Sequence, residues 1–153
     1  GGGGGERPAV RSIPEADALF AEAEDFRGRM VPRYANLKEA LERYQRLLLL
    51  HPESDKVDDA AYWIGPIYES RYLTHHQKAI DHYRRCVTWN PDTTTDARYR
   101  IAYILDYSLH DPAAAMEAYR EVLEHAPAGE LRDTAERRLQ ALERQHADAA
   151  GGE

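Results

Sequence analysis

Seven histidines make metal binding the first chemistry to consider, and three of them, His75, His76 and His82, lie closest together. A helix over 74–89 places His75 and His82 on one face but two turns, about 10 Å, apart. Two zinc ligands on one helix usually lie one turn apart, because both must reach the same ion at about 2 Å. The spacing therefore argues against a metal site, and we expect neither a metal nor another cofactor.

The sequence also offers no complete set of residues for nucleophilic or acid–base catalysis. The single cysteine, Cys86, could act as a nucleophile or redox sensor, but its place in the repeat described below is a core position. Asp58, Asp59, Glu69 and Asp106 could supply a general acid and base, yet no nucleophile or Gly-rich phosphate loop accompanies them. Acids near helix starts commonly serve the helix dipole. We therefore predict that the chain is not an enzyme.

Charge and hydropathy restrict the class of partner. The formal charge is −7, from 27 acids and 20 bases that are interspersed along the predicted helices. Nucleic-acid binding needs a basic stripe that neutralises phosphates, and none is evident. No apolar run approaches the roughly 20 residues of a transmembrane helix. We expect a protein partner, no nucleic acid and no transmembrane segment.

Both ends of the chain are expected to lie outside the folded part. Residues 1–13 begin with five glycines and read as a flexible tether or linker. A Gly-rich tether commonly follows the lipidated cysteine of a bacterial lipoprotein, so a lipid anchor could lie outside this sequence. A plain flexible linker is the competing interpretation. The folded domain is predicted over 14–147, followed by a disordered tail over 148–153.

The elements that would position any site come from an internal repeat. Three segments align without gaps: ALERYQRLLLLHP from Ala40, AIDHYRRCVTWNP from Ala79 and AMEAYREVLEHAP from Ala115. Each has an alanine, a tyrosine four residues later, an apolar residue three further on, and a proline at the thirteenth place. This spacing forms one helical stripe, which the proline ends. The residues expected to be buried on these stripes include Tyr44, Tyr83, Cys86 and Tyr119.

A fainter repeated unit precedes two of these helices. It carries small residues, Gly65 and Ala102, which let a neighbouring helix approach closely, as antiparallel helix pairs require. The predicted helices cover 14–27, 35–50, 55–72, 74–89, 94–109, 112–125 and 129–147. Ser54, Thr94 and Asp111, which precedes a proline, are the expected helix starts.

The Ala, Tyr, Pro spacing resembles the tetratricopeptide repeat, whose period is about 34 residues. The prolines here lie 39 and then 36 residues apart, and the additional residues fall in turns, where insertions are tolerated. The resemblance implies an all-α fold of antiparallel helix hairpins stacked as a short right-handed α-solenoid, with about three repeats and a capping helix.

A narrower resemblance concerns AAYWIGPIYESRY followed by AIDHYRRCV. These segments are most similar to repeats of bacterial envelope proteins, namely the Tol-Pal-associated periplasmic protein and the outer-membrane assembly lipoprotein. The likeness implies a periplasmic or outer-membrane-anchored lipoprotein rather than a cytoplasmic protein.

In the repeat family the first helix of each hairpin faces a concave groove, and the matching positions here form an aromatic and acidic channel. The predicted groove residues are Phe20, Asp59, Tyr62, Glu69, Asp96, Tyr99, Tyr103, Asp106, Arg137 and Arg144. Tyrosine offers a large contact area with few rotatable bonds, which suits recognition. The competing interpretation packs Tyr62 and Tyr99 between hairpins.

The resemblance thus implies a non-enzymatic module that binds a peptide or partner helix in its groove, within a bacterial envelope complex. A structural subunit that self-associates through its helix edges is the alternative. The sequence does not determine the oligomeric state.

Overall fold

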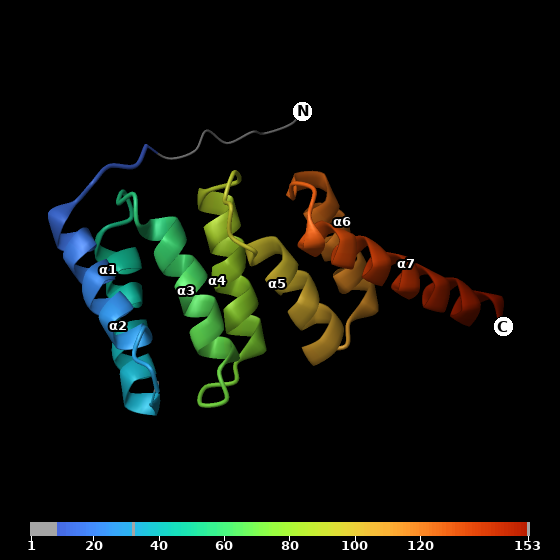
Figure 1. Ribbon diagram of the computed structural model, residues 1–153, viewed down its shortest axis with the longest axis horizontal. Coiled ribbons are helices and arrows are strands. Elements are labelled where there is room, and N and C mark those ends of the chain that lie inside the picture. The colour runs from blue at the N-terminus through green and yellow to red at the C-terminus, as the bar shows by residue number, and fades with distance from the viewer. Residues whose placement is uncertain (1–8, 32, 153) are drawn as a thin grey trace. The chain divides into compact units, whose positions relative to one another are not determined.

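The computed structural model describes residues 9–31 and 33–152. Within these residues the chain folds into seven α-helices and one π-helical turn, in the order that Figure 1 shows. The elements are α1 (Pro14–Arg27), α2 (Tyr34–Leu50), α3 (Val57–Glu69), α4 (His76–Trp89), α5 (Ala97–Tyr103), η1 (Ile104–Ser108), α6 (Pro112–His125) and α7 (Glu130–Gly151). The all-helical class and the seven helices packed as hairpins confirm the prediction from the repeat.

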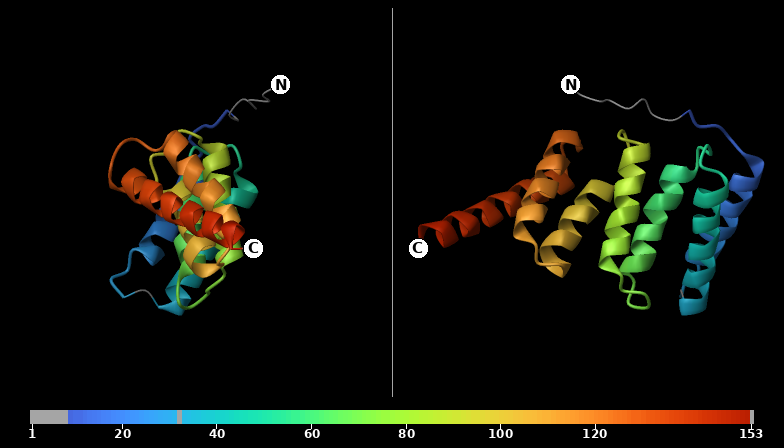
Figure 2. Two further views of the ribbon diagram at one scale, coloured as in Figure 1. Left: turned by 90° about the vertical axis from the view of Figure 1, so that its right-hand side faces the viewer. Right: turned by 180° about the vertical axis from the view of Figure 1, so that it is seen from behind.

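The chain divides into two compact units, the first of which covers residues 1–93. In its described part, α1 packs against α2, α3 packs against α4, and α2 also contacts α3. Figures 1 and 2 show each of the two pairs as a hairpin of helices lying side by side.

The second unit covers residues 94–153 and is described up to residue 152. Its hairpin consists of α5, continued without a break by η1, and α6. The last helix, α7, packs against α6 and follows the third hairpin, as the predicted capping helix should.

The second helix of each hairpin buries the predicted stripe. Tyr44, Tyr83 and Tyr119 are among the largest fully buried side chains. Cys86, which lies on α4 with Tyr83, is buried as well. Burying a large apolar side chain is worth about 1.5–3 kcal/mol, so these tyrosines supply much of the hydrophobic stabilisation of each hairpin. The structure thus places Cys86 in the core, as its repeat position predicts.

The small residue Gly65 has the role predicted for it. A Cβ atom added there would lie 2.3 Å from Cζ of Tyr83, far inside van der Waals contact. The backbone of α3 therefore lies directly against the ring of a buried tyrosine from α4, which only glycine permits.

Two of the three predicted helix starts lie at other residues. The helix expected from 55 begins at Val57, and Ser54 is a buried loop residue whose hydroxyl accepts a hydrogen bond from the Lys56 amide. The helix expected from Thr94 begins at Ala97. The prediction at Asp111 is correct, because its carboxylate accepts a hydrogen bond from the Ala114 amide at the start of α6.

The helix predicted over 94–109 changes type part-way along. After Tyr103 the backbone widens into η1, where the Leu109 amide donates to the Ile104 carbonyl at 2.9 Å, one residue further along than in an α-helix. Such π-helical turns are rare, and they frequently occur at functional sites. The following turn contains His110, which has a positive φ of 51°.

The boundaries of the folded part are wider than 14–147. Arg11 exchanges two backbone hydrogen bonds with Glu53 and Asp55, and Ile13 is buried, so residues 11–13 pack with the first unit rather than extend the tether. At the other end, α7 continues through Gly151 into the predicted tail. Residues 1–8 and 153 lie outside the described residues. In the part that is described, no helix is both long and apolar enough to span a membrane.

Candidate binding surface

A hydrogen bond between the second-helix tyrosine and a first-helix carboxylate recurs in all three hairpins. In each case the buried phenol donates to the acid. The pairs are Tyr44 with Glu24, Tyr83 with Glu69 (2.5 Å) and Tyr119 with Asp106 (2.9 Å). Charge-assisted bonds of this kind are stronger than bonds between neutral groups. Glu69 and Asp106, two acids predicted to line the groove, therefore also hold the hairpins together.

An aromatic side chain of the first helix packs on each of these tyrosines. The ring-centroid distances are 5.8 Å for Phe20 on Tyr44, 5.6 Å for Tyr62 on Tyr83 and 6.3 Å for Tyr99 on Tyr119. The three first-helix rings are half-buried, so each has one side in the hairpin and another toward solvent. Tyr62 and Tyr99 thus pack within their hairpins, as one of the two interpretations expected, and keep part of each ring exposed.

In the first unit, Arg27 links these groups to α3. Its guanidinium donates to both carboxylate oxygens of Glu24 and to the Tyr44 hydroxyl, and it lies over the Trp63 ring at 3.5 Å. Burial and the hydrogen bond to Glu24 raise the pKa of Tyr44, so this phenol stays a donor. The charge of Glu24 is therefore neutralised within the unit.

Asp59 has a different environment. It is half-buried at the start of α3, and no ion pair to it is found in the described part of the chain. Burial raises the pKa of its carboxyl, and the neighbouring charge of Asp58 adds to the effect. A cationic group placed beside Asp59 would relieve this unfavourable charge.

In the second unit, Asp106 is not an exposed groove acid, which corrects the prediction. It is buried in η1 and binds Arg138 of α7 through two bonds, Nε to Oδ2 at 2.5 Å and Nη2 to Oδ1 at 2.9 Å. Burial opposes ionisation of Asp106, but the hydrogen bonds from Arg138 and Tyr119 outweigh it and lower the pKa. This carboxylate is neutralised by Arg138 and does not attract a ligand.

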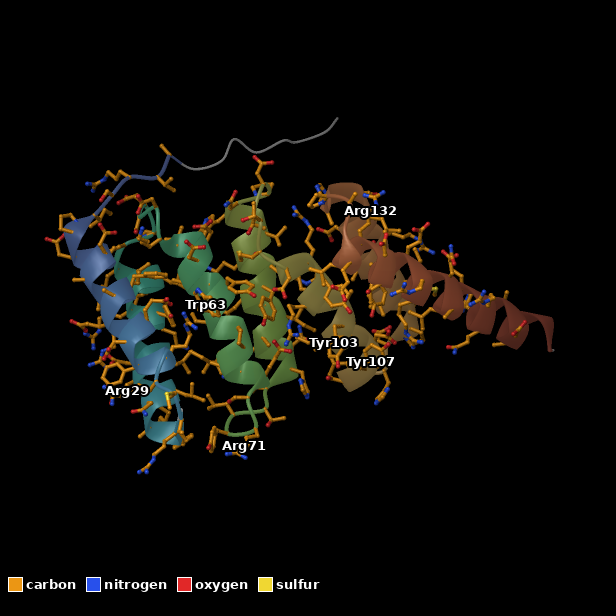
Figure 3. The ribbon with its side chains drawn as sticks, viewed as in Figure 1. Arg29, Trp63, Arg71, Tyr103, Tyr107 and Arg132 are labelled. Atoms are coloured by element: carbon orange, nitrogen blue, oxygen red, sulfur yellow. The ribbon has the colours of Figure 1, made fainter. Side chains whose placement is uncertain are left out.

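Three tyrosines form a row along α5 and η1. The ring centroids of Tyr99 and Tyr103 lie 6.3 Å apart, and those of Tyr103 and Tyr107 lie 4.8 Å apart. Tyr103 is 38% exposed and Tyr107 is 49% exposed. Figure 3 shows the last two rings next to each other beside the ribbon of α5 and η1. We call Tyr99, Tyr103 and Tyr107 the tyrosine row.

Comparison with known proteins agrees with this geometry. Residues 59–93, which cover most of α3 and all of α4, match the profile of the tetratricopeptide repeat. A solved structure, the Sgt2 tetratricopeptide repeat domain of Aspergillus fumigatus, superposes with a TM-score of 0.62 at 19% identity, over 95% of this chain and 87% of that one. No curated protein matches the sequence.

The chain has the tetratricopeptide repeat fold. Domains with this repeat are generally modules for protein–protein interaction and are typically not catalytic. The 19% identity establishes the architecture and carries no information on the ligand. The matches give no support for an origin in the bacterial envelope.

The remaining predicted groove residues lie at the edges of the repeats. Asp96 is half-buried at the N-cap of α5, without a side-chain bond to the helix amides. Arg137 and Arg144 are exposed on α7, where Arg137 donates to Thr134. The structure brings Tyr99, Tyr103 and Asp106 together in the second unit.

Three residues at this surface, Tyr107, Arg27 and Arg138, were not predicted from the sequence. Tyr107 had a readable signal, because it follows Tyr103 by four residues just as Tyr103 follows Tyr99. Arg27 and Arg138 had none, since each acts through contacts with another helix.

Two of the three histidines that suggested a metal, His75 and His82, have local structural contacts. His75 is the N-cap of α4, where its ring accepts from the Lys78 amide, and Nδ1 of His82 lies 2.8 Å from the Lys78 carbonyl. Among the described residues, no group of three or more His, Cys, Asp or Glu side chains is arranged to hold a metal ion.

Proposed function

We propose that this chain binds a peptide or a partner helix on the first-helix faces of its repeats, with the tyrosine row as the principal anchor. The observation that carries the proposal is the row itself: three rings spaced at 6.3 and 4.8 Å, two of them well exposed. Exposed clusters of large apolar rings on soluble domains usually mark interaction sites. Tyrosine is also enriched among residues that dominate binding energies.

The chemistry of the ligand follows from which charges are already neutralised. Asp106 is paired with Arg138, so the second unit offers rings rather than negative charge. Asp59 in the first unit has a raised pKa and would be stabilised by a cation. We infer that the tyrosine row takes apolar or aromatic side chains of a ligand. In the first unit, considered by itself, Asp59 would accept a Lys or Arg.

The other predicted groove residues have secondary parts in this proposal. Phe20 and Tyr62 extend the aromatic surface in the first unit, whereas Glu69 accepts from the buried Tyr83 and Asp96 lies at the N-cap of α5, so neither acid is a principal contact in this proposal. The exposed Arg137 and Arg144 could hold a carboxylate of the ligand. The setting in a bacterial envelope complex, as a lipid-anchored or periplasmic protein, rests on the sequence resemblance alone.

A selection from a random peptide library on the immobilised protein, followed by calorimetric titration of the selected peptides, tests the proposal. Tyr103→Ala with Tyr107→Ala should weaken binding by about 2 kcal/mol, or roughly thirtyfold, since both rings would lose their contacts. Tyr99 is left in place because it packs on buried Tyr119. Tyr34→Ala with Tyr72→Ala is the matched control, a second exposed pair of contacting tyrosines, at 46% and 37% exposure.

Equal loss of affinity in both double variants, or none in either, would mean that the tyrosine row is not the anchor. The alternative function, a subunit that self-associates, predicts a different result. Sedimentation velocity would then show a concentration-dependent dimer of the wild type that Tyr103→Ala with Tyr107→Ala leaves intact.

A further inference from the structure

The turn between α1 and α2 and the turn between α3 and α4 lie together at one end of the first unit. Tyr34 directly follows the first turn and Tyr72 lies in the second, and the centroids of their rings are 6.4 Å apart. Figure 1 shows both turns at the same end of their hairpins, and Figure 3 places Arg29 and Arg71 there. The two turns therefore form one continuous surface.

Apolar side chains project from this end. Met30 is 100% exposed and Val31 is 74% exposed, although both are residues that proteins ordinarily bury. Tyr34 and Tyr72 lie beside them with part of each ring in solvent. We call Met30, Val31, Tyr34 and Tyr72, with the cations described next, the basic tip.

Charge is segregated to the same place. Segments 28–38 and 70–78 contain five of the 20 Lys and Arg residues of the chain and none of its 27 acids. This corrects the prediction of evenly interspersed charge. The cations in these two segments are Arg29, Arg33, Lys38, Arg71 and Lys78.

Four of the five cations lie over aromatic rings. Lys38 lies 5.3 Å from the Tyr34 ring centroid, and Arg71 lies 4.9 Å from that of Tyr72 and donates to its hydroxyl. Arg29 lies 4.8 Å from the Phe26 ring centroid and also contacts the exposed Asp25 at 3.5 Å. Stacking of this kind leaves the full positive charge available to an external anion.

We propose that the basic tip binds an anionic membrane surface, with Met30 and Val31 entering the acyl region and the cations contacting lipid headgroups. Tyrosine is enriched at the headgroup level of membranes, where its ring is apolar and its hydroxyl polar. Each Lys or Arg near an anionic bilayer adds attraction, and inserted apolar side chains add a term that does not depend on charge. The basic tip combines both contributions at one end of two hairpins.

The charge of the whole chain favours a lipid surface with a defined orientation. With a formal charge of −7, the remainder of the protein is repelled by an anionic bilayer. An approach with the basic tip foremost brings cations and no acids of these two segments to the bilayer. Two adjacent apolar side chains at a protruding turn suit the non-directional interior of a bilayer, which accepts them without a matching pocket.

Co-sedimentation with vesicles tests this proposal. Vesicles of phosphatidylcholine with about 30% phosphatidylglycerol should bind the wild type, and vesicles of phosphatidylcholine alone should bind it roughly tenfold more weakly. Met30→Ser with Val31→Ser should reduce binding to the anionic vesicles by about tenfold. Arg29→Gln with Arg71→Gln should have a similar effect and should also reduce the dependence of binding on salt.

Two control variants remove exposed apolar side chains elsewhere. Leu49→Ser with Leu50→Ser changes two exposed leucines of α2, and Tyr103→Ala with Tyr107→Ala changes the tyrosine row. Both should bind the anionic vesicles as the wild type does. Circular dichroism of every variant establishes that the helices are retained.

Several results would overturn the proposal. These are no binding of the wild type to the anionic vesicles, equal binding to both kinds of vesicle, or losses as large in the controls as in the basic-tip variants. Binding to poly-glutamate without binding to vesicles would instead assign the basic tip to an acidic protein. Because the peptide selection is decided by the tyrosine row and uses no lipid, either proposal can fail while the other stands.

Discussion

Replacing Gly65 by alanine tests whether close helix approach holds the first unit together. In an exposed helix this change stabilises a protein by about 1 kcal/mol, because alanine is the better helix former. Here the new Cβ would lie 2.3, 2.4 and 2.7 Å from three ring atoms of Tyr83. Real Cβ contacts are almost never shorter than 3.0 Å, so either the ring or α3 must move.

The Tyr83 ring has little freedom to move away. It is fully buried, its hydroxyl donates to Glu69 at 2.5 Å, and Tyr62 packs on its face at 5.6 Å. Overpacking a rigid site of this kind costs about 1–3 kcal/mol. We expect Gly65→Ala to destabilise the protein by roughly that amount despite its better helix propensity.

Urea denaturation followed by circular dichroism measures the effect, and two variants control it. Gly151→Ala adds a Cβ at the last residue of α7, where no atom lies within 4 Å and helix propensity counts little, so its stability should stay within about 0.5 kcal/mol of wild type. In the background Tyr83→Leu, which removes the ring, Gly65→Ala should lose most of its cost. A Gly65→Ala protein as stable as the wild type would refute the close-packing argument.

Two other predictions concern the second unit. Asp106→Asn should cost about 2–3 kcal/mol at neutral pH, because Arg138 and the Tyr119 hydroxyl lose a charged acceptor in a buried site. Since the folded pKa of Asp106 is lowered, its contribution is present above the unfolded value near 3.9 and is lost as the pH falls toward the folded one. Urea midpoints from pH 7 to 3 should therefore fall more steeply for the wild type than for Asp106→Asn. His110→Gly should raise the thermal midpoint, because His110 has a positive φ of 51° that glycine adopts without strain. The free energy of unfolding should increase by at most about 1 kcal/mol. A lower midpoint would show that this conformation costs little.

The parts of the fold that repeat could be predicted from the sequence. The Ala, Tyr, apolar and Pro spacing occurs three times, and its tyrosines Tyr44, Tyr83 and Tyr119 are all buried on second helices. The close helix approach at Gly65 could also be predicted, since a small residue inside a helical pattern indicates close packing. Periodic burial depends only on neighbours along one helix, which a single sequence contains.

Contacts between helices far apart in sequence could not be predicted. Asp106 reads as an exposed acid because its partner, Arg138, lies 32 residues away on α7. The π-helical turn that contains Asp106 has no marker residue such as proline or glycine. The basic tip did have a signal, the absence of acids from 28–38 and 70–78, but it becomes meaningful only when Tyr34 and Tyr72 are seen in contact.

The recurring tyrosine–carboxylate bond changes how charge on the first helices should be interpreted. An acid on this face looks like a ligand contact, yet Glu69 and Asp106 each accept from a buried phenol, and Asp106 also binds an arginine. If such an acid paired with a ligand instead, the buried phenol of its hairpin would lose its hydrogen-bond acceptor. The free-energy cost of that unpaired phenol exceeds the stabilisation from an exposed ion pair. Recognition by this chain should therefore depend on its rings and on Asp59, a half-buried acid of α3 for which no ion pair is found in the described residues.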